Sequence, residues 1–304
     1  MSDASTNTNT NAKITFGLML RPYKEGDSLH TVMEFNRTCI EALPANFNTL
    51  WAEDHLQWGT NDCLECFSTL CFLAGKYPQF RVGSLVLDQS YRNPALVAKM
   101  AANLQAISQS GMVLGLGAGW KEDEYIAYGY SFPPASVRLD QLEEAAIIIR
   151  SMWQSQPASY KGKYYQIDDA YCEPPPNPPV PLLIGGGGGK RTLAIVAHYA
   201  DWWNYNSVPL QEYAHKLDIL KQHCQQIGRD ISDITLTYLA TLSVAENPAR
   251  IITSPSKHYV AGTPEQVITE IKQFQALGVT HFMFRMPDLQ TLDLFASKVA
   301  PYSG

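Results

Sequence analysis

The sequence predicts an α/β fold, a (β/α)8 TIM barrel, on three observations. Short runs rich in β-branched residues alternate with longer amphipathic segments, and eight such pairs follow one another along the chain. The 304 residues fit such a barrel, which typically has about 250 residues plus insertions. Polar and glycine-rich motifs follow the strands, where a barrel of this kind carries its active site. A doubly wound sheet is the alternative fold.

The expected elements follow in chain order. The strands are expected at 14–20, 49–52, 81–87, 112–116, 182–184, 201–203, 234–239 and 280–284. The helices are expected at 28–43, 63–75, 94–107, 137–153, 190–198, 210–227, from 263 onward, and 289–299. Ser28 and Asn93 are suited to cap helices, with Pro94 at the first helical position, and Thr263, Pro264 and Gln266 form a capping arrangement.

Three segments are too long to be simple connections. Residues 117–136 form an insertion after the fourth strand, and residues 156–181 form another before the fifth, with a hairpin at 160–168 and then a proline-rich stretch. A third long segment follows the seventh strand and ends at residue 261. Residues 1–12, rich in Ser, Thr and Asn, are expected to be a disordered tail, and residues 13–304 a single barrel domain.

Composition narrows the classes of partner. The 23 Lys and Arg residues against 29 Asp and Glu give a formal charge of −6 without a basic block, so neither nucleic acid nor a membrane surface is expected as a partner. No apolar stretch reaches the roughly 18 residues of a membrane helix. Six cysteines without an export signal indicate reduced thiols and a cytoplasmic protein. A small molecule is the expected partner.

A run of five glycines follows the fifth strand and precedes a helix. Backbone N–H groups there can converge on a phosphate, and the helix N-terminus and two basic residues add positive charge. The run fails the Walker A pattern, which argues against a P-loop NTPase. A flexible connection without a ligand is the alternative. The candidate cofactor-binding residues are Gly185, Gly186, Gly187, Gly188, Gly189, Lys190 and Arg191.

A second glycine-rich run, Gly115, Gly117 and Gly119, ends the fourth strand and is followed by Trp120. It lacks the spacing of the dinucleotide fingerprint and comes late in the chain, so a Rossmann fold is not indicated. In a barrel, such glycines allow a flat ring to lie against the strand ends. Alternatively, they only relieve crowding inside the barrel.

The second strand continues into a segment with two carboxylates and an imidazole among aromatic residues. Glu53, Asp54 and His55 form a candidate acid–base site, because histidine titrates near neutral pH and a neighbouring carboxylate can fix its tautomer. A solvated loop histidine is the alternative. No HExxH pattern or second nearby histidine completes a metal site, so no metal is expected. After the sixth strand, Asn204 is a polar group suited to face a ligand.

The cysteines Cys63, Cys66 and Cys71 admit a zinc or redox interpretation. A C-x-x-C pair needs a second pair or histidine partners for zinc, and a thioredoxin-like context for redox chemistry. Packing of the second helix is therefore the favoured interpretation.

These residues together resemble the bacterial-luciferase-like superfamily of flavin- and deazaflavin-dependent oxidoreductases. The resemblance covers residues 14–206 and 261–284. The segments that carry it are 51–55, 92–100, 114–120 with Asp123 and Glu124, 183–188 with 190–193, and 261–267.

The resemblance implies several properties of the site. Members bind reduced FMN or coenzyme F420 at the C-terminal face of the barrel. In the deazaflavin-dependent dehydrogenases an Asp–His pair matches Asp54 and His55, with the histidine transferring a proton and the aspartate lying against the cofactor. Trp58 lies near a substrate-facing aromatic position. Trp120 stands where those enzymes carry a glutamate proton donor, which argues against a sugar-phosphate dehydrogenase.

The resemblance also implies a non-proline cis peptide under the ring, here between Leu85 and Val86, which join the candidate cofactor-binding residues. Glu53, Trp58, Trp120 and Asn204 are assigned to the substrate pocket.

The implied function is an oxidoreductase that uses F420 or FMN to transfer a hydride to or from a small organic substrate, or oxygenates it with O₂. Lys190 and Arg191 slightly favour F420 with its anionic tail. A separate flavin or F420 reductase and a homodimer are the further partners expected. The alternatives are a non-catalytic flavin-binding protein and a flavin-free barrel enzyme for a phosphorylated metabolite.

Overall fold

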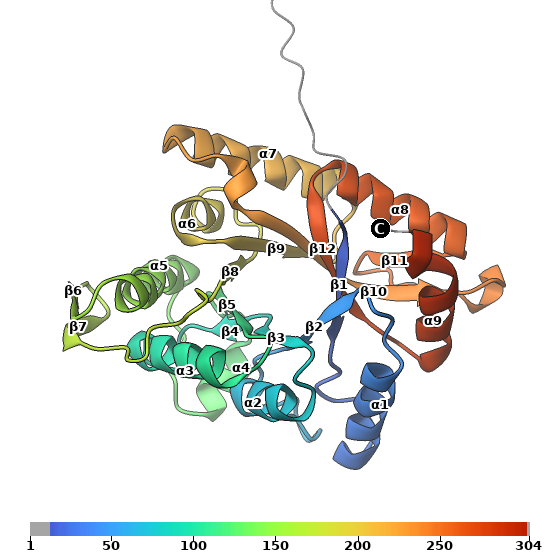
Figure 1. Cartoon of the computed structure of the whole chain (residues 1–304), viewed down its shortest axis with the longest axis horizontal. Helices are drawn as coiled ribbons and strands as arrows, with labels where there is room; N and C mark the ends of the chain where they lie inside the picture. The colour runs from blue at the N-terminus through green and yellow to red at the C-terminus, as the bar shows by residue number, and fades with distance from the viewer. Residues whose placement is uncertain (1–12, 303–304) are drawn as a thin grey trace, which may run out of the picture.

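The computed structural model describes residues 13–302 and contains a closed barrel of eight parallel strands with helices outside it (Figure 1). The barrel closes because β12 pairs with β1, with His281 opposite Thr15. The predicted (β/α)8 barrel is confirmed, and the tail expected at residues 1–12 lies outside the described residues. In barrel order the strands are β1 (Thr15–Met19), β2 (Phe47–Ala52), β3 (Arg81–Ser84), β5 (Met112–Gly117), β8 (Leu182–Gly185), β9 (Trp202–Asn206), β10 (Thr235–Val244) and β12 (Val279–Arg285).

One principal helix follows each barrel strand, and these helices form the outer ring in Figure 1. The predicted caps are confirmed: the side chains of Ser28, Asn93 and Thr263 each accept a bond from a first-turn N–H group, and Thr263 forms a full capping box with Gln266. The helices are α1 (Leu29–Glu41), α2 (Cys66–Lys76), α3 (Pro94–Ile107), α5 (Ala135–Gln154), α6 (Thr192–Tyr199), α7 (Leu210–Gln226), α8 (Pro264–Ala276) and α9 (Leu289–Leu294).

Several predicted bounds are wrong. The seventh strand extends to Val244, since its second half pairs with β11 (Tyr259–Gly262), which lies at the end of the third long segment. Helix α2 begins at Cys66, because Glu65 accepts bonds from the next N–H groups and acts as its N-cap. Helix α6 begins at Thr192 instead of 190.

The insertions also contain regular structure. The insertion at 117–136 contains the short helix α4 (Glu122–Ala127), which the sequence analysis missed. The hairpin before the fifth strand is confirmed as β6 (Ala158–Lys161) and β7 (Gln166–Ala170). The last helix is shorter than expected, since a π-helical turn, Phe295–Val299, follows α9.

The barrel interior is filled around one indole. Trp51 on β2 is fully buried, and a Cβ added at Gly17 or Gly83 on the neighbouring strands would lie 2.4 Å from its side chain. Glycine at these two positions therefore leaves room for the indole. The other buried members of this inner cluster are Met19, Leu85, Val113, Leu183, Leu239 and Met283.

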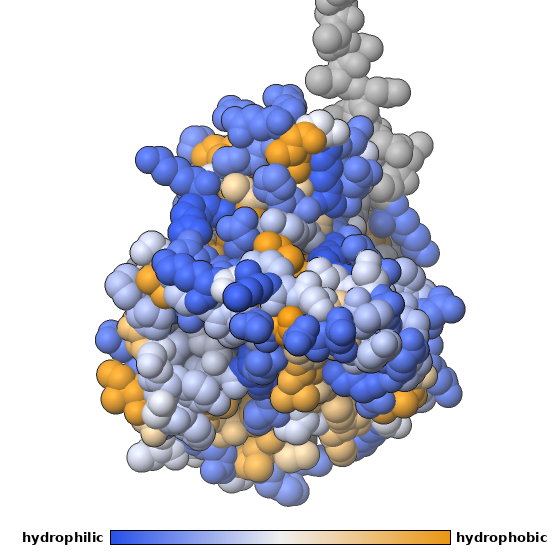
Figure 2. Space-filling model, turned by 90° about the vertical axis from the view of Figure 1, so that its left-hand side faces the viewer, coloured by the Kyte–Doolittle hydropathy of each residue, from blue (hydrophilic) through white to orange (hydrophobic). Residues whose placement is uncertain are grey.

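The outer surface combines polar residues with small hydrophobic groups. Figure 2 shows such groups toward the lower end of the face it presents, the end at which α3 and α4 lie in Figure 1. Exposed apolar side chains on these elements include Leu96 and Ile107 of α3 and Ile126 of α4. No helix within residues 13–302 is long and apolar enough to cross a membrane.

A buried histidine lies inside the barrel, toward the N-terminal ends of the strands, where it is opposite the first residue of β1. The Nε2 atom of His281 is 3.0 Å from the Thr49 hydroxyl, and Nδ1 is 2.8 Å from the Thr15 hydroxyl. Trp51 Nε1 donates to Thr49 Oγ1 at 2.7 Å, so that hydroxyl joins the indole to the imidazole. Burial lowers the pKa of His281 to about 3, so the ring is neutral.

His281 makes the stability of the fold sensitive to acid. Its folded pKa is below the unfolded value, so its contribution is present above about pH 6.5 and is lost as the pH falls toward 3. Below pH 6.5 the free energy of unfolding should fall by up to about 1.4 kcal/mol per pH unit more in the wild type than in His281→Gln.

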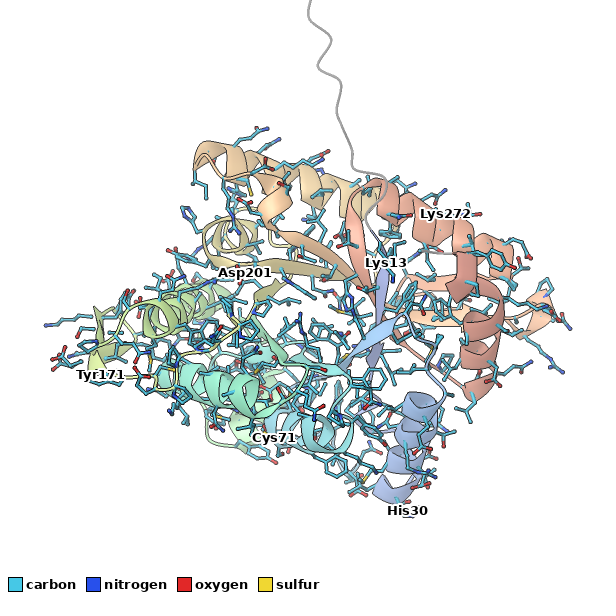
Figure 3. All side chains as sticks on the ribbon, viewed as in Figure 1. Lys13, His30, Cys71, Tyr171, Asp201 and Lys272 are labelled. Atoms are coloured by element: carbon cyan, nitrogen blue, oxygen red, sulfur yellow. The ribbon has the colours of Figure 1, made fainter. Side chains whose placement is uncertain are left out.

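Urea unfolding at pH 7 and pH 5 measures this difference. The matched control is His30→Gln, since His30 lies at the outer surface of α1 (Figure 3) and should leave the wild-type pH dependence unchanged. Parallel pH dependence in wild type and His281→Gln would show that His281 is not held neutral.

Candidate active site

A cavity of about 990 Å³ opens at the C-terminal ends of the barrel strands. Its walls come from segments that follow strands far apart in sequence, including those after β2, β5, β8 and β12. This is the end of the barrel where the active site was predicted. The predicted residues that line it are Glu53, Asp54, His55, Trp58, Leu85, Val86, Gly117, Gly119, Trp120, Gly185, Gly186, Gly187, Gly188 and Asn204.

His55 is buried and held by a carboxylate. Its Nδ1 atom lies 3.1 and 3.2 Å from the two carboxylate oxygens of Glu124, a residue of α4 whose side chain is 1% exposed. Because an ionised carboxylate only accepts, Nδ1 carries the proton and Nε2 is free to act at the cavity. The Tyr91 hydroxyl (3.0 Å) and the Gln57 N–H (3.2 Å) also donate to Glu124.

Asp54, adjacent to His55, is the centre of a buried ion pair. Its fully buried carboxylate accepts from Arg92 Nη1 at 2.8 Å and Nη2 at 2.9 Å, and from the Asp88 N–H at 2.9 Å. Arg92 also binds Glu65, the N-cap of α2. Asp54 thus connects the end of β2 with three other segments around the cavity.

Glu53 pairs with a residue from the far end of the sequence. Its Oε1 atom accepts from Arg285 Nε at 2.9 Å and from Nη2 of the same guanidinium. Its Oε2 atom is 3.6 Å from His55 Nε2. Both side chains of the pair line the cavity and retain some exposure.

Aromatic rings form one wall of the cavity. Trp58 lies 4.7 Å from the His55 ring centroid and stacks on Tyr23 at 4.9 Å, and Lys121 Nζ lies 4.8 Å from the Trp58 ring centroid. Trp120 is 67% exposed at the rim, with its centroid 6.3 Å from that of Trp58. The structure therefore brings both predicted substrate-pocket tryptophans together beside His55.

The glycine run after β8 divides into two parts. Gly185 to Gly188 line the cavity together with Thr192 at the start of α6, and no side chain caps that helix. A Cβ at Gly187 would lie 2.5 Å from the Tyr205 ring. The predicted residues Gly189, Lys190 and Arg191 are not among the cavity-lining residues. The Arg191 side chain binds Asp140 of α5.

The glycines of β5 also have separate surroundings. A Cβ at Gly115 would lie 2.1 Å from the Ser84 carbonyl oxygen, so this glycine permits close packing of the backbone and does not line the cavity. Gly117 and Gly119 do line it. The Leu85–Val86 peptide bond is cis, as predicted, and it separates β3 from the short strand β4 (Leu87–Asp88).

Asp88 is a further buried carboxyl group at the cavity. The Tyr125 hydroxyl donates to both of its oxygens, at 2.6 and 2.5 Å, and the Ser90 N–H donates at 2.9 Å. Burial raises the pKa of Asp88 to about 6 despite these donors.

Sequence reasoning assigned no role to Glu124, Arg285 or Asp88. Glu124 follows the fourth-strand glycines in a segment noted only for its family resemblance, and it is 69 residues from His55. No local spacing marks it as the partner of His55. Asn204 was predicted and is buried, with Nδ2 donating to Thr237 Oγ1 at 3.0 Å.

Of the three cysteines expected to pack the second helix, Cys66 is buried, Cys63 precedes the helix and is partly buried, and Cys71 is exposed. Cys66 is buried with its Sγ 3.5 Å from the Ala52 carbonyl oxygen, and burial raises its pKa well above the usual value. Cys71 lies on the outer side of α2 and is exposed (Figure 3). Burial raises the pKa of Cys63 to about 11, which disfavours the reactive thiolate. Within residues 13–302 no group of three His, Cys, Asp or Glu residues is placed to hold a metal ion.

Comparison with known proteins identifies the family of the chain. Residues 41–254 match the luciferase-like monooxygenase family, and the chain belongs to this family. An F420-dependent glucose-6-phosphate dehydrogenase of Kineococcus radiotolerans is 30% identical over 135 residues, which cover 43% of this chain and 40% of that protein. The pyrimidine monooxygenase RutA of Escherichia coli (strain SMS-3-5 / SECEC) is 28% identical over 218 residues, 70% of this chain and 58% of RutA. The matches thus span less than two thirds of either relative.

Solved structures share the fold over nearly the whole chain. An F420-dependent secondary alcohol dehydrogenase superposes with a TM-score of 0.82 at 20% identity, covering 96% of this chain and 99% of the other. An EDTA monooxygenase from Chelativorans sp. BNC1 superposes with a TM-score of 0.80 at 13% identity, covering 95% and 93%. At these identities the likeness concerns the fold alone.

The buried ion pair makes a prediction for stability. Replacing Arg92 with Met leaves the Asp54 carboxylate buried without its partner, which typically costs about 3 to 5 kcal/mol. The matched control is Arg37→Met, since Arg37 pairs with Glu34 and Glu41 on the exposed face of α1, where solvent screens such pairs and they contribute little to stability.

Urea unfolding of the two variants at pH 7 checks this prediction. A loss in Arg92→Met no larger than that in Arg37→Met would show that the Asp54 network does not hold the structure around the cavity.

Proposed function

We propose that the chain is an oxidoreductase that binds F420 or FMN in the cavity and transfers a hydride to or from a small organic substrate, or oxygenates it with O₂. The observation that carries this proposal is the pair formed by His55 and Glu124, which holds an oriented imidazole in the same cavity that the glycine run lines. Family membership supports the redox chemistry, and the names of the relatives include both F420-dependent dehydrogenases and a monooxygenase.

The residues present fit a flat cofactor with a phosphate. Gly185 to Gly188 and Gly117 offer backbone instead of side chains to the cavity, and Leu85 and Val86 lie against the same wall. The uncapped start of α6 and the Thr192 hydroxyl suit a phosphate group. A bound flavin or deazaflavin would supply the hydride chemistry, while the protein binds, orients and shields it.

The choice between F420 and FMN is not decided by the charges beside the glycine run. Arg191, which slightly favoured F420, is bound to Asp140 and lies outside the cavity lining. Lys190 is exposed and also lies outside it. We therefore retain both cofactors in the proposal.

His55 is the proposed catalytic acid or base. Glu124 accepts from Nδ1, which directs the ring and leaves Nε2 to receive or deliver a proton at the substrate. Glu124 is a positioning residue in this proposal, because it acts through His55. Asp54 is also a positioning residue, since Arg92 takes both of its carboxylate oxygens.

The two alternatives account for less of the site. A non-catalytic flavin-binding protein has no need of a buried His–Glu pair at the cavity. A flavin-free enzyme for a phosphorylated metabolite uses the glycine run but leaves the tryptophan wall beside His55 without a role. Measuring the binding of F420 and of FMN separately tests the flavin-free alternative, and turnover by wild type and by His55→Ala tests the non-catalytic one.

Three further proposals concern the setting of the enzyme. The exposed side chains Phe72 of α2 and Leu96 and Ile107 of α3 support a homodimer that covers this face. A separate flavin or F420 reductase would supply the reduced cofactor if the reaction uses O₂. A cytoplasmic location is consistent with the free cysteines.

The glycine wall can be tested by cofactor affinity. In Gly187→Ala the new methyl group meets the Tyr205 ring and narrows the backbone approach, so affinity for F420 or FMN should fall by at least about tenfold. The matched control is Gly189→Ala, whose Cβ has ordinary contact with Ile219 at 3.4 Å and lies outside the cavity lining.

Cofactor affinity is read by fluorescence titration, with circular dichroism to confirm folding. Equal cofactor affinity in folded Gly187→Ala and Gly189→Ala would show that the glycine run is not part of the cofactor site.

The proton-transfer role can be tested by kinetics. His55→Ala should keep cofactor affinity within a few fold and lose at least about 100-fold in kcat, because a positioned acid–base group typically contributes 10² to 10⁴. Glu124→Gln should lower kcat less and shift its pH profile, because the amide orients Nδ1 without a charge.

The assay uses the best substrate found in a panel of secondary alcohols and pyrimidines, with single-turnover rates to isolate the chemical step. Near wild-type single-turnover rates for His55→Ala across pH 5 to 9 would assign the proton transfer to water or to the substrate.

A further inference from the structure

The pair of Glu53 and Arg285 leaves two polar atoms unused at the cavity. Arg285 directs both Nε and Nη2 to one oxygen, Glu53 Oε1. Among residues 13–302, no acceptor is bound to Arg285 Nη1, and no donor lies within hydrogen-bond distance of Glu53 Oε2, whose neighbour His55 Nε2 is 3.6 Å away. The side chains of Glu53 and Arg285 are 14% and 33% exposed, and both line the cavity. A donor and an acceptor are thus available from one ion pair.

The charge of this pair selects a neutral ligand. A carboxylate bound to Arg285 would also meet the negative charge of Glu53, and an ammonium bound to Glu53 would meet the guanidinium. A neutral group that carries both an N–H and a C=O satisfies both atoms without adding charge. A ring amide presents these two groups on the same edge, because the ring holds the amide in the cis form.

The shape of the neighbouring wall selects a planar ligand. Trp58 and Trp120 flank His55 with ring centroids 4.7 and 5.8 Å from its own, and Trp120 is largely exposed. A flat, unsaturated ring gains contact area and stacking against such a wall. His55 is close to both features, with its ring centroid 4.7 Å from that of Trp58 and its Nε2 atom 3.6 Å from Glu53 Oε2, so a ring that uses both features lies beside the imidazole.

We propose that the substrate is a planar, uncharged heterocycle with a ring amide, whose N–H donates to Glu53 and whose C=O accepts from Arg285. This inference rests on the proposed function, since it assigns the substrate class of the same cavity.

Binding of three small probes tests the proposal. The probes are 2-pyridone, which has the ring amide, N-methyl-2-pyridone, which lacks the N–H, and benzoate, a planar anion. Wild type should bind 2-pyridone at least about tenfold more tightly than either other probe, because a hydrogen bond to a charged group contributes about that factor or more. Isothermal titration is run on the free protein and on protein saturated with the cofactor that binds.

Substitutions of Glu53 and Arg285 should change the relative affinities for the probes in different directions. Glu53→Gln leaves Arg285 without its counter-charge, so benzoate should gain at least about tenfold in affinity. Arg285→Met removes the donor, so 2-pyridone should lose at least about tenfold. The matched control Lys257→Met removes another cation from the cavity lining and should leave the binding of the two neutral probes unchanged.

The probe titrations test the substrate class, and the cofactor titrations test the proposed function. Equal binding of 2-pyridone and N-methyl-2-pyridone by wild type, tighter binding of benzoate, or no binding of any probe would overturn it, even in a protein that binds F420 or FMN. Failure to bind either cofactor overturns the proposed function, while the titration of the free protein still decides the substrate class. If one variant does not fold, the other variant and the wild-type preference decide the outcome.

Discussion

The candidate site depends on one buried ion pair, between Asp54 and Arg92. A carboxylate with no exposed surface is expensive to bury unless it is paired and hydrogen-bonded, and Asp54 has two guanidinium bonds and one backbone bond. These bonds join the end of β2 to β4 and to the segment that precedes α3, and Arg92 extends the network to the N-cap of α2. His55 is the next residue after Asp54, so its position over the cavity follows from this network.

The sequence was sufficient to predict the barrel and the end of it that carries the cavity. Alternation of strands and helices and the caps at Asn93 and Thr263 are local properties, and local patterns identify them. The extension of β10 and the strand β11 were missed because each exists only through pairing with the other. A strand that depends on a partner about 15 or more residues away has no local signature.

The same distinction separates the predicted from the unpredicted parts of the site. His55 and the glycine run could be predicted because each comes directly after a predicted strand. In a barrel the segments that follow the strands all lie at the C-terminal face. Glu124 was not assigned because its contact with His55 bridges 69 residues. For Arg191 a local pattern gave the wrong contact. Its place next to the glycines in the sequence predicted a phosphate contact, but its long side chain reaches Asp140 of α5 instead.

The carboxylates at the cavity are each matched by donors from another segment. Asp54 has Arg92, Glu53 has Arg285, and Asp88 has the Tyr125 hydroxyl. Such pairing limits the net field in the cavity, so selectivity there depends on the direction of the remaining donors and acceptors more than on charge. Glu124 is likewise satisfied by His55 Nδ1 and the Tyr91 hydroxyl. In the described part of the chain His55 Nε2, like Glu53 Oε2 beside it, then has no hydrogen-bond partner at the cavity, and the pairing around the imidazole is the physical reason to place proton transfer there.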